Sequence, residues 1–231
     1  MQNPASPGNF LAPTTIAIGN RSTAVATGDV DGDGTTDIAV ANQDSGGNTG
    51  RVSVFLNAAG NTGVFTRVDA VAGTEPIAVK IGDVDGDGLA DLIVANEGPG
   101  LYGMGTSGVS VLLQTVAGTF LAPVTYATAR GTVSVAVGDV NSDSLPDLVT
   151  ANRGGSSTGT ISVLLQDATR PGVFFSAVNY AGICEPLSVA LGDLNQDGRI
   201  DIAVADGDRA TVMFQSTITA GTFAAPVKVG Q

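Results

Sequence analysis

Apolar and polar residues alternate in four short stretches of the chain that are close copies of one another. The stretches are TAVAT (23–27), IAVKI (77–81), VSVAV (133–137) and LSVAL (187–191). A period of two places successive side chains on opposite faces of an extended backbone. Each stretch is therefore predicted to form a β-strand with one buried face.

Three further β-rich runs accompany each alternating stretch. The second run begins with Asp and covers 37–41, 91–95, 147–151 and 201–205. The third covers 51–56, 108–113, 160–165 and 210–214. The fourth opens at Phe65, Phe120, Phe174 and Phe223. Because no stretch of about ten residues has a helical period, the sequence predicts an all-β chain.

The runs recur as a repeat, since the Asp-rich segment between the first and second runs returns every 54 to 56 residues. We place the four units at approximately 10–64, 65–119, 120–173 and 174–231 and treat them as a single domain. Four short strands joined by up-and-down turns match one blade of a propeller. The predicted fold is thus a β-propeller of four-stranded antiparallel blades, four of them complete. A further copy of the Phe-led run, 10–19, is predicted to add one extra N-terminal strand.

The repeated segment between the first two runs is rich in side-chain oxygens. Asp or Asn occupies positions 1, 3, 5 and 9, and position 7 can offer its backbone carbonyl. Side chains at alternate positions of a tightly curved loop can point to one centre. A site made only of oxygen ligands, without nitrogen or sulfur, suits calcium, and it suits magnesium less well. The predicted ligands are Asp29, Asp31, Asp33, Thr35 and Asp37; Asp83, Asp85, Asp87, Leu89 and Asp91; Asp139, Asn141, Asp143, Leu145 and Asp147; and Asp193, Asn195, Asp197, Arg199 and Asp201.

These loops share the ligand spacing of an EF-hand but differ from it in their surroundings. Gly34, Gly88 and Gly198 at position 6 allow the sharp turn, yet position 12 carries no acid and the flanking segments are strands. The third loop has Ser144 at position 6 and Asn141 at position 3. Fewer carboxylates generally weaken calcium binding. We therefore expect up to four Ca²⁺ ions, with the third loop the weakest site.

The charge of the chain limits the classes of partner that it can bind. The net charge is −12, and the acidic excess lies within the four loops. A strongly acidic protein without a basic face is a poor ligand for nucleic acid, and no apolar run is long enough for membrane insertion. The alternative for the acidic segments themselves is that they are simply solvated Asp-Gly turns.

The repeat resembles the FG-GAP and VCBS repeats, the family that includes the integrin alpha-chain propeller. The resemblance covers 10–229 and is carried by the four acidic loops, the VSVLL-type strands and the segments NFLAP, TFLAP and TFAAP. It implies a calcium-stabilised β-propeller, usually of seven blades, that is secreted or displayed on a cell surface. Four units fall short of seven, which leaves open a closed four-bladed ring, a ring shared by two chains, an open fragment or a filament.

We expect a non-enzymatic adhesion or ligand-binding module, whose partner is a protein or glycan ligand or copies of itself. The chain has no His and no nucleophile motif, and calcium already accounts for its paired carboxylates. The alternatives are a structural subunit joined through the surplus strand and a carbohydrate-binding lectin. The insertions at 43–50, 97–108 and 153–159 are candidate contact surfaces. Tyr126 and Tyr180 are expected to be structural, and Cys184 to be a small buried residue.

Overall fold

A computed structural model of the chain describes residues 15–18, 21–43, 49–58, 64–100, 106–155, 159–207 and 209–229. Every regular element within these residues is a β-strand, and none is a helix, which confirms the all-β prediction. The described part of the chain accordingly offers no helix long and apolar enough to cross a membrane.

The strands form four antiparallel four-stranded sheets. The first sheet contains β1 (Ser22–Gly28), β2 (Asp37–Asn42), β3 (Gly50–Asn57) and β4 (Phe65–Gly73). The second contains β5 (Pro76–Gly82), β6 (Asp91–Asn96), β7 (Gly108–Leu112) and β10 (Val124–Ala127). The third contains β11 (Thr132–Gly138), β12 (Asp147–Asn152), β13 (Gly159–Leu164) and β14 (Val178–Ile183). The fourth contains β15 (Pro186–Gly192), β16 (Asp201–Asp206), β17 (Arg209–Met213) and β18 (Val227–Val229).

Each sheet is a meander in which neighbours in the chain pair, so every acidic loop joins the first two strands of its sheet. The register is the same in all four: Gly28 lies opposite Asp37, and the equivalent pairs are Gly82 and Asp91, Gly138 and Asp147, and Gly192 and Asp201. The alternating stretches and the Asp-led runs are thus the first and second strands, as predicted. The last strand of each sheet lies in the Phe-led segment that follows the third strand. The four sheets therefore span 22–73, 76–127, 132–183 and 186–229.

The Phe-led segments differ from the prediction in three of the four sheets. β4 does begin at Phe65, but β10, β14 and β18 begin four residues after Phe120, Phe174 and Phe223. Phe120 belongs to a separate short hairpin of β8 (Gln114–Val116) with β9 (Thr119–Phe120). Phe174 and Phe223 form isolated bridges to Gln166 and Gln215. Pro123 and Pro226 follow two of these residues, and proline has no N–H to donate to a ladder.

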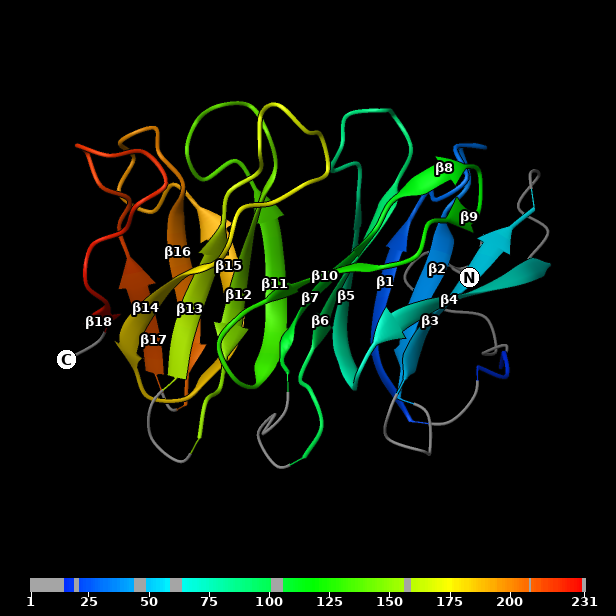
Figure 1. Cartoon of the computed structure of the whole chain (residues 1–231), viewed down its shortest axis with the longest axis horizontal. Coiled ribbons are helices and arrows are strands. Elements are labelled where there is room, and N and C mark those ends of the chain that lie inside the picture. Colours follow the sequence, from blue (N-terminus) through cyan, green and yellow to red (C-terminus); the bar gives the residue numbers. More distant parts are fainter. Residues whose placement is uncertain are drawn as a thin grey trace, which may run out of the picture.

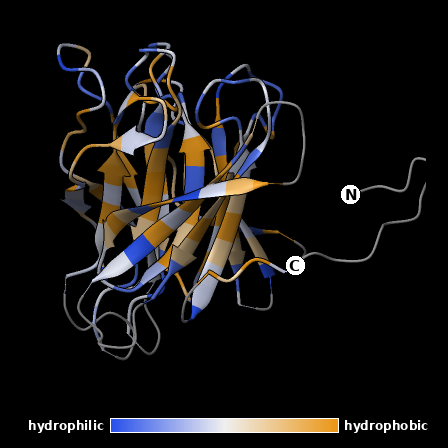
Figure 2. Ribbon diagram, turned by 90° about the vertical axis from the view of Figure 1, so that its right-hand side faces the viewer, coloured by the Kyte–Doolittle hydropathy of each residue, from blue (hydrophilic) through white to orange (hydrophobic). Residues whose placement is uncertain are grey.

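The four sheets stand side by side in chain order, with the first and fourth at opposite ends of the long axis (Figure 1). The first strands of neighbouring sheets contact one another, β1 with β5, β5 with β11 and β11 with β15, and each later first strand also contacts the second strand of the preceding sheet. Three apolar clusters fill the three spaces between the sheets. Figure 2 views the molecule from the end formed by the first sheet and shows hydrophobic residues along the strands. β6 and β12 are buried along their whole length because a sheet covers each face.

Two expectations about single segments have different outcomes. Most of the extra N-terminal strand expected at 10–19 lies outside the described residues, and its described part, 15–18, is not in a strand. Cys184 is exposed rather than buried, which corrects the expectation from the sequence. It follows β14 at the connection to β15, where the next residue facing the core is Pro186.

Candidate metal centres

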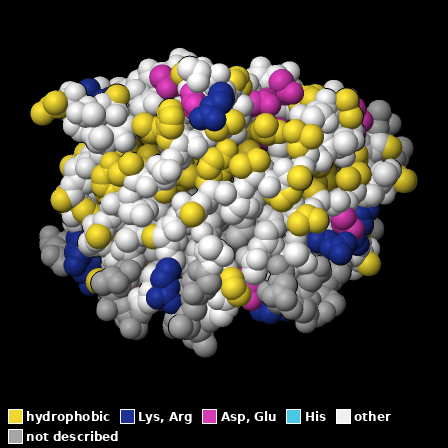
Figure 3. All heavy atoms as spheres, viewed as in Figure 1, with side chains coloured by type: hydrophobic (Ala, Val, Ile, Leu, Met, Phe, Trp, Pro, Cys, Tyr) yellow, Lys and Arg dark blue, Asp and Glu magenta, His cyan; other side chains and the backbone are white. Residues whose placement is uncertain are grey.

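The four acidic loops lie at one edge of the array, because every sheet has the same strand order and direction. They connect β1 with β2, β5 with β6, β11 with β12 and β15 with β16 at the top of Figure 1. The space-filling view shows acidic side chains gathered along this same upper edge (Figure 3). The fold therefore collects the candidate ligands of all four repeats on one side of the molecule.

In the first loop, backbone N–H groups fix the first and last carboxylates. The N–H groups of Gly32 and Gly34 donate to Asp29 Oδ1 and Oδ2 at 2.8 and 2.9 Å. Asp37 is fully buried at the start of β2 and accepts from the N–H groups of Val30 and Asn57, both at 2.7 Å. Asp37 thus ties the loop to the end of β3. Asp91, Asp147 and Asp201 repeat this contact with the N–H groups of Gln114, Gln166 and Gln215.

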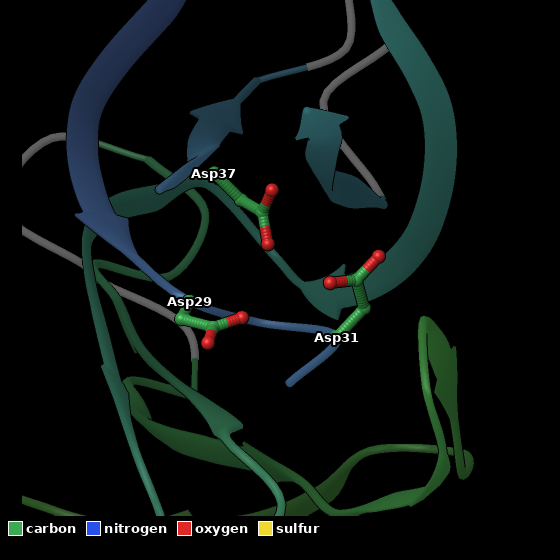
Figure 4. A group of neighbouring side chains, drawn as sticks. All are labelled: Asp29, Asp31 and Asp37. Atoms are coloured by element: carbon green, nitrogen blue, oxygen red, sulfur yellow. The ribbon is translucent and has the colours of Figure 1, made fainter. Parts of the chain in front are cut away.

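Two loops bring three carboxylates around one point. Oxygens of Asp29, Asp31 and Asp37 lie within 4.8 Å of one another, and the equivalent trio in the second loop is Asp83, Asp85 and Asp91. Figure 4 shows the three carboxylates of the first loop facing a common space. Calcium binds oxygen at about 2.3–2.6 Å, so two ligands of one ion lie up to about 5 Å apart. The donor set and its spacing fit a hard divalent cation.

The carboxylate at position 5 is predicted to be a ligand, but it does not join these trios. Asp33 Oδ1 instead accepts from the N–H and the hydroxyl of Thr35 at 2.8 and 2.6 Å, and Asp87 accepts from the N–H of Leu89. The Thr35 hydroxyl and N–H lower the pKa of Asp33. One oxygen of each of these carboxylates therefore stabilises the turn.

The third and fourth loops contain an amide where the first two have an acid. Asn141 Nδ2 donates to Asp143 Oδ2 at 3.0 Å, and Asn195 Nδ2 donates to Asp197 Oδ2 at the same distance. Arg199 also pairs with Asp197 at 2.9 Å. Among the described residues, these two loops hold no trio of acids as close as those in the first two. The acidic clusters that could hold a metal are thus best formed at Asp29 and Asp83.

Burial and mutual repulsion shift the pKa values of several loop carboxylates upward. Burial raises the pKa of Asp91 and of Asp147 to about 6, and nearby carboxylates add to this against the opposing backbone N–H bonds. Burial likewise raises the pKa of Asp31 and Asp85, with further increases from their acidic neighbours. A cation placed among these oxygens would remove the cost of their like charges.

The backbone of the loops takes a left-handed conformation at two positions. At position 6, Gly34, Gly88 and Gly198 have φ between 82° and 87°, as the sequence predicts. Ser144 has the same conformation in the third loop, with φ of 70°. Position 4 is also left-handed, a requirement that sequence reasoning missed; it carries Gly32, Gly86, Ser142 and Gln196. The third loop therefore places two non-glycine residues in a region that favours glycine.

A second group that sequence reasoning missed is the glutamine after the third strand. Buried Gln114 Nε2 donates to Val30 O in the loop of the preceding sheet at 2.8 Å, and its Oε1 accepts from Gly118 N. Gln215 makes the same contact to Val140 O, whereas Gln166 bonds to Pro146 O of its own loop. The amide recurs at equivalent positions of the repeats, so aligning the repeats would have indicated it. The bonds of Gln114 and Gln215 each join a candidate metal loop to the next sheet.

Comparison with family models agrees with this geometry. A model described as the FG-GAP-like repeat matches residues 29–94 and 139–204, which together make up more than half of the chain. Each matched region begins at the first aspartate of an acidic loop and ends in the second strand of the following sheet. A search of curated proteins finds no significant match. From the match and the four repeated loops, the chain belongs to the FG-GAP-like repeat family.

Proposed function

We propose that this chain is an extracellular calcium-binding repeat module whose loops bind up to four Ca²⁺ ions at the positions predicted from the sequence. The single observation that carries this proposal is the convergence of Asp29, Asp31 and Asp37, repeated at Asp83, Asp85 and Asp91. In the third and fourth loops, Asn141 and Asn195 can turn their oxygens to an ion. The carbonyls of Thr35, Leu89, Leu145 and Arg199 complete the proposed ligand sets.

The role of calcium in this proposal is structural rather than catalytic. Asp37 joins its loop to β3, and Gln114 joins the first loop to the second sheet. An ion bound in the loop would therefore hold together two strands of one sheet and the interface with the next. Binding to the folded state alone stabilises it in proportion to the logarithm of ligand concentration.

We further propose that the four sheets are consecutive blades of a β-propeller-type array that acts in adhesion or ligand binding. The side-by-side first strands and the meander topology support the blade arrangement. A lectin site built on Tyr126 or Tyr180 has less support. Their rings pack edge-on against Phe174 and Phe223, and each hydroxyl accepts from the backbone N–H of that Phe at 3.3 Å. Tyr102, in the longest insertion, lies outside the described residues.

Calorimetric titration of the metal-free chain with CaCl₂ tests the proposal. We expect saturable binding of up to four ions, with the first two loops the tightest, and loss of one strong site in Asp85→Asn. Glu185→Gln is the matched control, because it removes one exposed carboxylate outside the loops. Absence of saturable heat, or equal loss of binding in both variants, would contradict specific calcium sites.

A further inference from the structure

The two ends of the array carry positions that are exposed here, although their equivalents are buried in the internal interfaces. We define the trailing face of a sheet as the face toward the following sheet, and the leading face as the face toward the preceding one. The fourth sheet has no following sheet and the first has no preceding sheet among the described residues (Figure 1).

The trailing face of the fourth sheet is exposed and mostly apolar, with Arg209 among the residues that line it. It is formed by Ser188, Ala190, Ala203, Ala205 and Ala210, which line a shallow groove of about 610 Å³. Ala205 and Ala210 are exposed, whereas their equivalents in the first sheet, Ala41 and Val52, are fully buried.

The loop beside this face shows the same loss of cover. Leu194, at position 2 of the fourth loop, is 48% exposed. Its equivalents Val30, Val84 and Val140 are 1% exposed or less. The difference arises because the first three loops each pack beneath a following sheet. No sheet among the described residues covers the fourth loop in this way.

The leading face of the first sheet is uncovered at β1, whereas Val40 and Phe55 on the next two strands of the same face are 5% and 3% exposed. Val25 in the middle of β1 is 65% exposed. The register of β1 with β2 makes it the equivalent of Val79, Val135 and Val189, which are 4%, 0% and 7% exposed. The segment before β1 lies near β4 instead, where the Arg67 guanidinium approaches the carbonyls of Ala17 and Ile18 at 3.5 and 3.4 Å.

The internal interfaces show which residues the two end faces would meet. In each internal interface, the residue at position 2 of an acidic loop is buried in the same apolar cluster as the central valine in the first strand of the following sheet. The three pairs are Val30 with Val79, Val84 with Val135, and Val140 with Val189. Leu194 and Val25 are the two halves of a fourth such pair. Their sheets stand at opposite ends of the long axis, so the two residues do not meet within one chain in this arrangement (Figure 1).

We propose that the trailing face of the fourth sheet binds the leading face of the first sheet of a second copy of this chain. The interface is head-to-tail, so each copy keeps one face free for the next unless the assembly closes. Two copies that close on each other would form a ring of eight sheets. The interaction uses the alanine-rich face of the fourth sheet and the exposed β1 strand of the first, and it does not depend on whether the loops bind calcium.

Light scattering after size-exclusion chromatography, in calcium buffer and over a range of concentrations, measures this association. We expect the unaltered chain to have a mass at least twice its monomer mass of 22.9 kDa. Ala205→Arg and Val25→Arg should each be monomeric when alone. An equimolar mixture should recover a dimer, since one intact leading face remains to meet one intact trailing face. Ile218→Arg, at an exposed turn residue that does not line the groove on the fourth sheet, is the matched control and should keep the larger mass.

Three outcomes would overturn the proposal. The first is a monomer at every concentration, which would indicate that another segment or further repeats cover these faces. The second is a dimer that survives in Val25→Arg but not in Ala205→Arg, which would indicate pairing of two trailing faces. The third is a mixture of the two variants that stays monomeric although circular dichroism shows both to be folded.

Discussion

At the scale of single residues, the loops combine positions that the ligand pattern predicts with positions that the backbone dictates. The convergence of Asp29, Asp31 and Asp37 follows from their spacing in a tight turn. The hydrogen bonds that direct Asp33 to Thr35 could not be read from the pattern, because every Asp in it has the same chemistry. The left-handed position 4 shows only when repeats with Ser142 or Gln196 are compared with those that have glycine.

The strained third loop gives a prediction for stability. Ser144→Gly should raise the free energy of unfolding by about 1 kcal/mol, because a left-handed non-glycine residue costs roughly 1–2 kcal/mol. Thr66→Gly, on an exposed β4 position, should lower stability, since glycine weakens a strand. Urea unfolding of both variants measures the difference. An unchanged or lower midpoint in Ser144→Gly would contradict the account of this loop.

The raised pKa values of Asp91 and Asp147 predict how calcium and protons compete. Both pKa values are about 6, above the value near 4 of an unfolded Asp, so in chelator their contribution to stability is present below about pH 4. That contribution is lost as the pH rises through about 6 and the buried carboxyls ionise. Calcium binds the ionised form, so the calcium-dependent rise in Tm should be larger at pH 7.5 than at pH 5. Equal rises at the two pH values would show that these carboxyls are not ligands.

At the scale of elements, the sequence correctly predicts strands that have a strict local period. It misplaces strand ends that depend on pairing with residues elsewhere in the chain. The alternation in 133–137 and the acidic turn after it suffice to place β11 and β12. The late start of β10, β14 and β18 depends on how Phe120, Phe174 and Phe223 pair with the glutamines that follow the third strands. The exposure of Cys184 likewise depends on the packing of a connection rather than on its composition.

The glutamine that joins neighbouring sheets gives a prediction at this scale. Gln114→Ala should lower the free energy of unfolding by about 2–3 kcal/mol, since it leaves Val30 O and Gly118 N buried without partners. Thr115→Ala, at the adjacent exposed position, is the control and should change stability by less than about 0.5 kcal/mol. Equal midpoints for the two variants in urea would refute the role assigned to Gln114.

At the scale of the whole molecule, four sheets in a row leave two sheet faces without a neighbour in the described chain. The repeat count was readable from the sequence, but the exposure of Val25 and Leu194 required the packing of the sheets. The same packing explains why stability should be shared along the array. Each loop is bonded to its own sheet, and the first and third loops are also bonded to the next sheet by Gln114 and Gln215.

Thermal unfolding with calcium and with chelator is the measurement that tests the central claim most directly. A single site occupied at a calcium concentration of about 100 Kd adds about 2.7 kcal/mol, and for a chain of this size each 1 kcal/mol raises Tm by about 2–4 °C. We therefore predict that Tm at pH 7.5 falls by at least about 5 °C when calcium is replaced by chelator, and returns when calcium is restored. A Tm that is the same in calcium and in chelator would contradict a structural role for the loops.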